Sequence, residues 1–124
     1  MSELKLETIG QIAVNVNNLD AAMAFYRDIL GMNFLFQFPG LAFFDCNGVR
    51  LLLEELADWK HPSSILYYKV DDIQAAHQTL MSKGVEFTED PNLVAKMPDH
   101  DLWMAFFKDP SKNILAIMCE IYHD

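Results

Sequence analysis

Hydrophobic and polar residues alternate along residues 11–16, with apolar side chains at the even-numbered positions. This alternation predicts a half-buried β-strand. Asn18 then suits a helix N-cap, and apolar residues recur at helical spacing up to Gly31, a residue that typically ends helices. Three further strands are expected after this helix, separated by turn residues, at 33–38, 41–45 and 49–54.

The same order of elements occurs a second time, because the sequence contains an internal repeat. Residues 16–22 align with 70–76 at a spacing of 54, whereas 43–45 and 51–53 align with 107–109 and 115–117 at a spacing of 64. The second copy predicts a strand at 64–70, then a helix whose apolar stripe runs from Ile73 to Met81 and which stops at Gly84. Strands are expected near 85–88, 102–108 and 113–119.

Residues 31–34 align with 84–87 at a spacing of 53, so the change from 53 to 64 places an insertion of 11 residues within 88–102 of the second copy. This stretch contains Pro91 and Pro98, which interrupt regular structure, so we predict a loop. His100 lies in this loop between Asp99 and Asp101, and its side chain has metal-ligand chemistry. The loop is expected to be able to close over a binding site, as functional loops often do.

Two βαβββ modules predict an α+β fold in which curved mixed sheets form a cup with the helices outside. We expect a single domain over residues 1–124, with one module at about 9–58 and the other at about 63–121. The strand faces opposite the helices would line the cup, and concave surfaces of this kind usually bind something small.

By strand alternation, the cup face combines an apolar floor with a few polar groups, which is the usual form of a small-ligand site. The expected ligand-binding residues are Gln11, Asn15, Arg50, Leu52, Glu54, Ile65, Tyr67, Lys69, Trp103, Ala116, Met118 and Glu120. Trp103 would form one wall. In a plainer interpretation, the two cations and the two glutamates of this set pair with one another at the rim.

Composition excludes several classes of protein. With 124 residues, 52% of them hydrophobic, the chain is long and apolar enough to bury a core, which excludes disorder. A net charge of −9 argues against binding nucleic acid or anionic lipid, and no apolar run is long enough to span a membrane. Two cysteines cannot build a disulfide framework, so we expect a cytoplasmic protein.

The other histidines have structural interpretations: His77 is expected to pack on the second helix, His61 to lie in the linker between modules, and His123 to lie in the tail. No arrangement of residues resembles an activated nucleophile, and we therefore assign no catalytic residue.

Two groups of short motifs stand out along the chain: Asn18-Leu19-Asp20, Phe25-Tyr26 and Leu30-Gly31 near the start, and Asp109-Pro110-Ser111-Lys112-Asn113 before the last strand. In these motifs the chain resembles the vicinal oxygen chelate superfamily, which includes glyoxalase I, extradiol dioxygenases, fosfomycin-resistance enzymes and bleomycin-resistance binding proteins. The resemblance covers residues 9–120. These motifs identify the fold better than the chemistry, because the superfamily includes both enzymes and non-catalytic binders. Lys112 stands where a glycine is usual, which leaves the geometry of that turn open.

Enzymes of this superfamily hold a divalent metal with four side chains, and the resemblance places these positions at Gln11, Leu52, Ile65 and Ala116. Three of the four residues have no lone pair to offer a metal. We therefore expect neither a metal nor another cofactor.

The resemblance and the missing ligands together favour a metal-free small-molecule-binding protein of the glyoxalase/bleomycin-resistance type, and the resemblance implies a homodimer. Arg50 and Tyr67 are expected to orient a partly apolar ligand over a floor of Leu52, Ile65 and Ala116, and the acidic composition would suit a cationic ligand.

Two alternatives stay open. One is a glyoxalase-like lyase or dioxygenase with a non-standard metal site that uses Glu54, Glu120 or His100. The other is a metal-free isomerase with Glu54 or Glu120 as its general base, which requires a raised carboxylate pKa.

Overall fold

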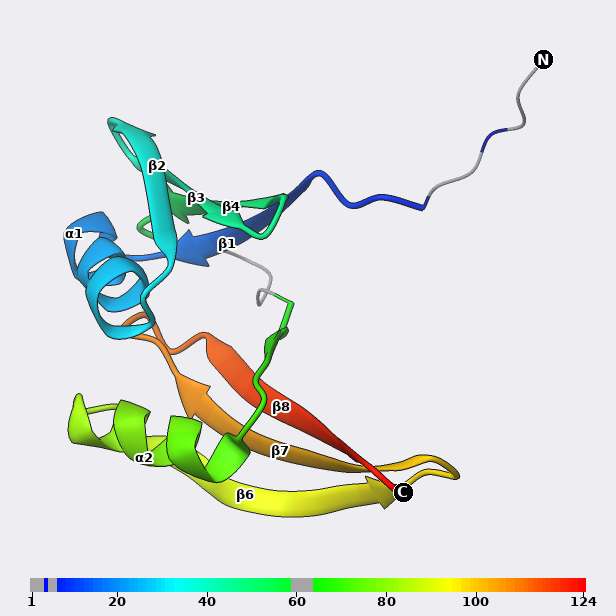
Figure 1. Ribbon diagram of the computed structural model, residues 1–124. Coiled ribbons are helices and arrows are strands. Elements are labelled where there is room, and N and C mark those ends of the chain that lie inside the picture. The colour runs from blue at the N-terminus through cyan, green and yellow to red at the C-terminus, as the bar shows by residue number, and fades with distance from the viewer. Residues whose placement is uncertain (1–3, 5–6, 59–63) are drawn as a thin grey trace. The chain divides into compact units, whose positions relative to one another are not determined.

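The structure is a computed structural model that describes residues 4, 7–58 and 64–124. It divides the chain into two compact units, unit 1 (Met1–Ser63) and unit 2 (Ser64–Asp124). Each unit contains helix and an open, curved sheet of four strands (Figure 1), so the predicted α+β class with two βαβββ modules is confirmed. His61 lies outside the described residues. In the described part of the chain, no helix is long and apolar enough to cross a membrane.

Unit 1 has the strand order β1-β4-β3-β2, in which β1 and β4 run parallel and the other neighbours antiparallel. The bounds are β1 (Gln11–Val16), β2 (Asn33–Phe38), β3 (Leu41–Cys46) and β4 (Val49–Glu55), close to those predicted. The predicted helix consists of two segments, α1 (Leu19–Met23) and the π-helix η1 (Ala24–Ile29).

Polar side chains fix the start of this helix. The side chain of Asn18 accepts a hydrogen bond from the N–H of Ala21 at 3.0 Å, which confirms the predicted N-cap. Glu55, at the end of β4, accepts a second from the N–H of Leu19 at 2.8 Å, so a neighbouring strand also satisfies a free helix donor. Gly31 follows the helix with φ 73°, the left-handed conformation expected at its C-terminal end.

Unit 2 repeats this topology with the order β5-β8-β7-β6, in which β5 and β8 run parallel. The bounds are β5 (Leu66–Lys69), α2 (Ile73–Ser82), β6 (Phe87–Lys96), β7 (His100–Lys108) and β8 (Ile114–Tyr122). The side chain of Asp72 caps α2 by accepting the N–H of Ala75 at 3.0 Å. Asp72 and Asn18 are equivalent in the repeat, so both copies begin their helix in the same way.

The predicted loop within 88–102 is wrong, because these residues extend a β-hairpin. β6 and β7 pair along their length, and the hairpin turns at 97–99, where the N–H of Met97 donates to the carbonyl of His100 at 2.8 Å. Pro91 fits because β6 is an edge strand and its register shifts between Glu89 and Asn92. The proline that suggested a loop therefore lies at a bulge of an edge strand.

The strand register also corrects one part of the repeat. Phe43 pairs with Leu52, and Phe106 pairs with Ala116, so Phe43 and Phe106 are equivalent at a spacing of 63. The predicted spacing of 64 for this strand is wrong because the last turn of unit 2 is one residue longer. Four residues, 46–49, connect one pair of cross-strand neighbours in unit 1, and five residues, 109–113, connect the equivalent pair in unit 2.

That longer turn has the geometry that the sequence left open. The carboxylate of Asp109 accepts hydrogen bonds from the backbone of Ser111 at 2.9 Å and of Asn113 at 2.8 Å, and a third from the Asn113 side chain at 2.9 Å. Within this ring of hydrogen bonds Lys112 has φ 73°. Lys112 thus adopts the left-handed conformation for which glycine is usual.

Each sheet has one face packed against its own helix and one face turned away from it, which we call the open face (Figure 1). The helix-facing side of unit 1 is fully buried at its centre, where the rings of Tyr26 and Phe44 lie 6.4 Å apart. In unit 2, Leu115, Phe107 and Cys119 are buried on the equivalent side. The open faces retain more exposure and carry most of the predicted site residues.

Candidate functional site

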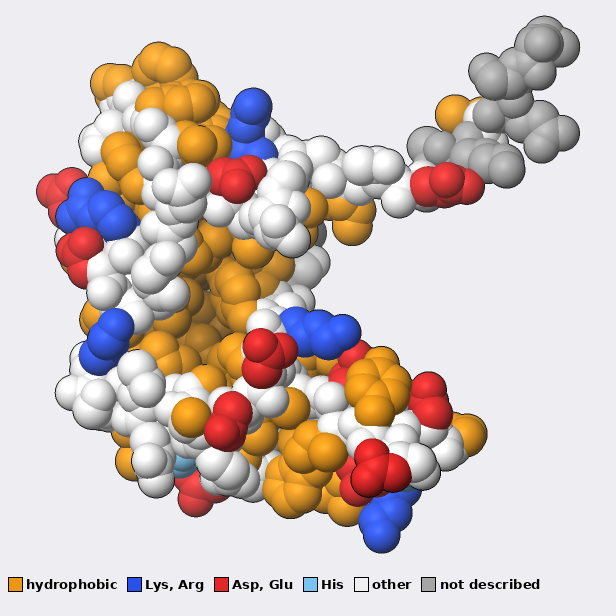
Figure 2. All heavy atoms as spheres, viewed as in Figure 1, with side chains coloured by type: hydrophobic (Ala, Val, Ile, Leu, Met, Phe, Trp, Pro, Cys, Tyr) orange, Lys and Arg blue, Asp and Glu red, His pale blue; other side chains and the backbone are white. Residues whose placement is uncertain are grey.

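The open face of unit 1 carries a cluster of three phenylalanines, Phe36, Phe38 and Phe43, which we call the Phe platform. Phe36 and Phe43 are stacked, with ring centroids 4.8 Å apart and planes 28° apart. Phe38 meets both rings edge-on, at 5.6 and 6.3 Å. Phe38 is 56% exposed and Phe36 42% exposed, so the platform presents ring surface outward. Figure 2 shows hydrophobic side chains gathered at the end of unit 1 where Figure 1 places β2 and β3.

Strand alternation in the sequence does not reveal this cluster, because β2 contains a bulge. Strict alternation would place Phe34, Phe36 and Phe38 on one face. The register shifts between Phe34 and Phe36, so Phe34 pairs with Phe44 on the helix-facing side whereas Phe36 pairs with Phe43 on the open face. The only signal in the sequence was the density of phenylalanine on two adjacent strands.

Arg50 lies beside the Phe platform on the same open face. Its guanidinium carbon is 5.9 Å from the centroid of the Phe43 ring, within reach of a cation–π contact. In the described part of the chain, Arg50 forms no ion pair. Asp45, its cross-strand neighbour, instead accepts the N–H of Gly48 at 3.2 Å in the adjacent turn.

The equivalent row in unit 2 has a different chemistry. Tyr67, Ala116 and Phe106 are cross-strand neighbours on β5, β8 and β7. The two rings meet edge-on with centroids 5.9 Å apart, although their strands lie on opposite sides of β8. Because strands two apart are separated by about 9.6 Å, the rings lean over Ala116, which has no exposed surface. A molecule on this face would therefore meet the two rings and not the predicted floor residue.

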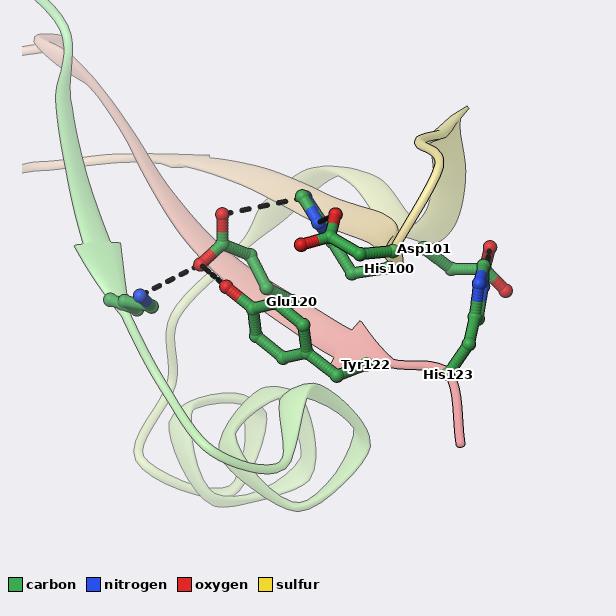
Figure 3. Close-up of polar contacts among 7 residues, drawn as sticks. His100, Asp101, Glu120, Tyr122 and His123 are labelled. Carbon is green, nitrogen blue, oxygen red and sulfur yellow. Dashed lines mark hydrogen bonds and ion pairs between the residues drawn. The ribbon is translucent and has the colours of Figure 1, made fainter.

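Charged residues of unit 2 pair with one another on the same face. Lys69 Nζ lies 2.7 Å from Glu120 Oε1, which Tyr122 Oη also approaches to 3.4 Å, and His100 Nε2 lies 3.5 Å from Glu120 Oε2. Figure 3 shows His100 and Tyr122 both pointing toward the Glu120 carboxylate. The rim pairing that the sequence offered as the plainer interpretation is thus present for Lys69 and Glu120.

These contacts set the ionisation of Glu120. The hydrogen bond from Lys69 lowers the pKa of the Glu120 carboxyl below its ordinary value, partial burial opposes the shift, and the positive charge of Lys69 adds to it. The same hydrogen bond raises the pKa of the Lys69 ammonium. A general base at neutral pH needs a raised carboxylate pKa, so the environment of Glu120 acts in the wrong direction for the isomerase alternative.

His100 and His123 hold the tip of the β6–β7 hairpin to the end of β8. His100 Nδ1 lies 2.7 Å from Asp99 Oδ1, and His123 Nε2 lies 3.0 Å from Asp101 Oδ1 (Figure 3). The N–H of His123 also donates to the carbonyl of Asp99 at 2.8 Å. His100 is therefore part of a paired strand, and the expectation that it sits in a loop able to close over the site is wrong.

The remaining predicted residues divide between the faces. On the open face of unit 1, Gln11 and Asn15 of β1 lie beside Arg50 and Glu54 of β4, and Leu52 lies between Ala13 and Phe43. On the open face of unit 2, Met118 lies between Lys69 and Met104. Ile65 is exposed just before β5. Trp103 differs, because it pairs with Cys119, whose side chain is buried on the helix-facing side. The register thus corrects the expectation that Trp103 forms a wall beside the Ala116 row.

His77 lies against β6 on α2, as the sequence predicted for a packed helix residue. Its ring is 4.4 Å from the Phe87 ring, and its Nε2 is 3.5 Å from Asp90 Oδ1. The ring therefore packs between α2 and β6, and its buried Nε2 has no hydrogen-bond partner among the described residues.

The four superfamily metal positions do not fit a divalent metal. Gln11 supplies one amide oxygen, whereas Leu52, Ile65 and Ala116 supply no donor, and Ala116 is covered by the rings of Tyr67 and Phe106. Among the residues that the structure describes, no group of three His, Cys, Asp or Glu side chains is arranged to hold a metal ion.

Known structures with a similar fold have diverse functions. A lactoylglutathione lyase from Agrobacterium tumefaciens has 21% identity and a TM-score of 0.76, with 93% of this chain and 95% of the lyase covered. TnmS3, an antibiotic-binding protein from Streptomyces sp. CB03234, also has 21% identity and a TM-score of 0.76, covering 95% of this chain and 99% of TnmS3. A glyoxalase/bleomycin resistance protein/dioxygenase from Alicyclobacillus acidocaldarius has 21% identity and a TM-score of 0.73, covering 94% and 92%.

At these identities the structural matches establish the fold alone. No curated protein matches the chain by sequence. A family model does match, over residues 8–117, which is most of the chain. The chain therefore belongs to the glyoxalase/bleomycin resistance protein/dioxygenase superfamily.

Proposed function

We propose that this protein binds a small, partly apolar molecule on the open faces of its sheets and does so without a metal. The observation that carries the proposal is the Phe platform beside Leu52 and Arg50, where exposed ring surface adjoins a cation that forms no ion pair among the described residues. Small-ligand sites typically combine an apolar surface with a few polar groups that fix orientation.

Two further observations support this proposal. TnmS3, which shares the fold, is described as an antibiotic-binding protein, so the superfamily fold is compatible with binding. Three of the four residues at the superfamily metal positions lack a donor atom, which argues against the lyase and dioxygenase alternatives in their usual form. Glu54 is proposed as a further contact for a ligand on the open face of unit 1, and Met118 as one on the open face of unit 2.

A thermal-shift screen of metabolites and antibiotics tests the proposal, because a ligand that binds only the folded state raises the melting temperature. We expect hits whose shifts persist in EDTA and weaken in Phe43→Ala. Elemental analysis should find no stoichiometric divalent metal in protein purified without chelator. About one zinc, nickel, manganese or iron per chain, with melting temperature and binding both lost in EDTA, would contradict the proposal.

We also propose that the protein is a cytoplasmic homodimer. Each sheet has two edge strands, β1 and β2 in unit 1 and β5 and β6 in unit 2, and such edges tend to be covered or paired. β6 is the longest of these edges, and Leu93 and Val94 on it are exposed. Sedimentation equilibrium at tens of micromolar should give a dimer, and a 14.2 kDa monomer would refute this part.

A further inference from the structure

We propose that the ligand has a planar aromatic ring with an attached anionic group, the ring lying on the Phe platform and the anion on Arg50. This inference rests on the proposed function, because it names the chemical class that the open face of unit 1 selects. It also departs from the expectation, based on net charge, that the ligand is a cation.

The Phe platform favours a flat partner over an aliphatic one. Aromatic rings interact through offset stacks and edge-to-face contacts with centroids about 4.5–7 Å apart. Phe36 and Phe43 already adopt the first arrangement with each other, and Phe38 adopts the second toward both. A planar ring added to this cluster can make both kinds of contact at once, whereas a puckered aliphatic ring can only fill space.

Arg50 supplies the anion preference. A guanidinium presents its donors in a planar fork that matches a carboxylate or phosphate with two parallel hydrogen bonds. The contact with the Phe43 ring holds this fork next to the platform, and Asp45, its cross-strand neighbour, directs one carboxylate oxygen to the Gly48 amide and forms no ion pair with Arg50. Among the described residues, the Arg50 guanidinium therefore has no carboxylate partner.

Other acidic groups do not cancel this preference. Glu54 lies four residues from Arg50 on β4, which corresponds to about 13 Å along a strand, beyond the screening length of about 8 Å at physiological salt. The net charge of −9 is spread over the chain and is screened in the same way. On the open face of unit 2, Lys69 is already paired with Glu120 at 2.7 Å, and Lys108, which shares this face, lacks the planar fork of a guanidinium, so the same preference is not expected there.

The test is a protein-observed NMR titration with four probes: 2-naphthoate, neutral 2-naphthylmethanol, cationic 2-naphthylmethylammonium and cyclohexanecarboxylate. A charge-assisted pair of this kind is expected to change affinity by about tenfold or more. We therefore expect 2-naphthoate to bind at least about tenfold more tightly than the neutral and cationic naphthyl probes. Aromatic contact should make it bind several-fold more tightly than cyclohexanecarboxylate, which has the same anion. The largest shifts should occur at Phe36, Phe38 and Arg50.

Two variants with the same change of charge provide the comparison. Arg50→Gln should remove the preference for 2-naphthoate over 2-naphthylmethanol, whereas Arg27→Gln, which removes an exposed cation on the helix, should preserve it. Phe38→Leu should weaken the binding of 2-naphthoate and of 2-naphthylmethanol and leave the Arg50-dependent ratio of these two affinities unchanged.

Three outcomes overturn the inference: no preference for 2-naphthoate, a preference that survives Arg50→Gln, or failure of all three naphthyl probes to bind. A fourth is movement of the Phe platform signals on dilution of the protein alone, which would identify the platform as a contact between copies of this chain. Hits from the thermal-shift screen that bind independently of Arg50 and the Phe platform would leave small-molecule binding standing while this inference fails.

Discussion

The equivalent rows of the two open faces differ in where the chain places its large side chains. In unit 1 the row is Ala13, Leu52, Phe43 and Phe36, and in unit 2 it is Tyr67, Ala116, Phe106 and Glu89. In unit 1 the aromatic rings lie side by side on β3 and β2, whereas in unit 2 two rings flank β8 and close over its alanine, with Tyr67 itself 46% exposed.

Arg50 on the open face of unit 1 and Lys69 on that of unit 2 differ in whether they form an ion pair. Arg50 rests on a phenylalanine ring without an ion pair among the described residues, whereas Lys69 is neutralised by Glu120. The repeat therefore preserves the backbone and the helix-facing core, but the two open faces have acquired different chemistry. Unit 1 presents a stacked aromatic cluster beside Arg50, whereas unit 2 covers its alanine with two rings and pairs Lys69 with Glu120.

The largest difference is expected for tryptophan at the equivalent positions Ala116 and Leu52. Ala116→Trp forces a large ring beneath Tyr67 and Phe106, where no exposed space exists, and should cost about 3 kcal/mol of unfolding free energy or more. Leu52→Trp enters a half-buried position and should cost about 1 kcal/mol or less. Urea denaturation measures both, and equal costs would break the contrast between the two rows.

The two turns that precede the last strands should respond differently to glycine. Lys112 has φ 73°, a left-handed conformation that is sterically unfavourable for a residue with a Cβ atom. Lys112→Gly should therefore stabilise the protein by about 0.5–1 kcal/mol. Asn47, with φ 50° in the turn of unit 1, belongs to a residue type that tolerates this conformation, and Asn47→Gly should gain less. A loss of stability in Lys112→Gly would show that the Lys112 side chain stabilises its turn.

The paired charges of unit 2 predict a pH dependence that is small but has a definite sign. Because the folded-state pKa of Glu120 is lowered, its stabilising effect is complete above the unfolded-state value near 4.5 and is lost as the pH falls through the lower folded-state pKa. Glu120→Gln should therefore lower the melting temperature by a constant amount from pH 8 to pH 5, and this difference should shrink below pH 4.5.

Glu86→Gln is the matched control for this measurement, since it removes the same charge from an exposed position of unit 2. Its melting temperature should differ little from that of the parent at any of these pH values. A Glu120→Gln difference that grows toward acid would mean that Glu120 stabilises the fold in its protonated form.

Much of the fold was predictable from the sequence, because alternation and helical spacing are local patterns that survive in both copies. The bounds of β1, the caps at Asn18 and Asp72, and the glycine after each helix follow from such patterns. The hairpin of β6 and β7 was missed because prolines in bulged edge strands resemble prolines in loops.

The candidate site was only partly predictable for a related reason. Alternation placed Arg50, Leu52 and Glu120 on the correct faces, but a single bulge at Leu35 reverses the faces of Phe36 and Phe38 relative to Phe34. A bulge depends on pairing with the neighbouring strand, and no residue type in β2 marks it. The covering of Ala116 likewise depends on two rings from different strands.

The most direct test of the account is an NMR map of the bound state of the tightest ligand from the thermal-shift screen, recorded in EDTA. We predict saturable binding in the chelator, with the largest shifts at Phe36, Phe38, Phe43 and Arg50. Loss of binding in EDTA, or shifts concentrated on helix-facing residues such as Phe44 and Leu115, would contradict it.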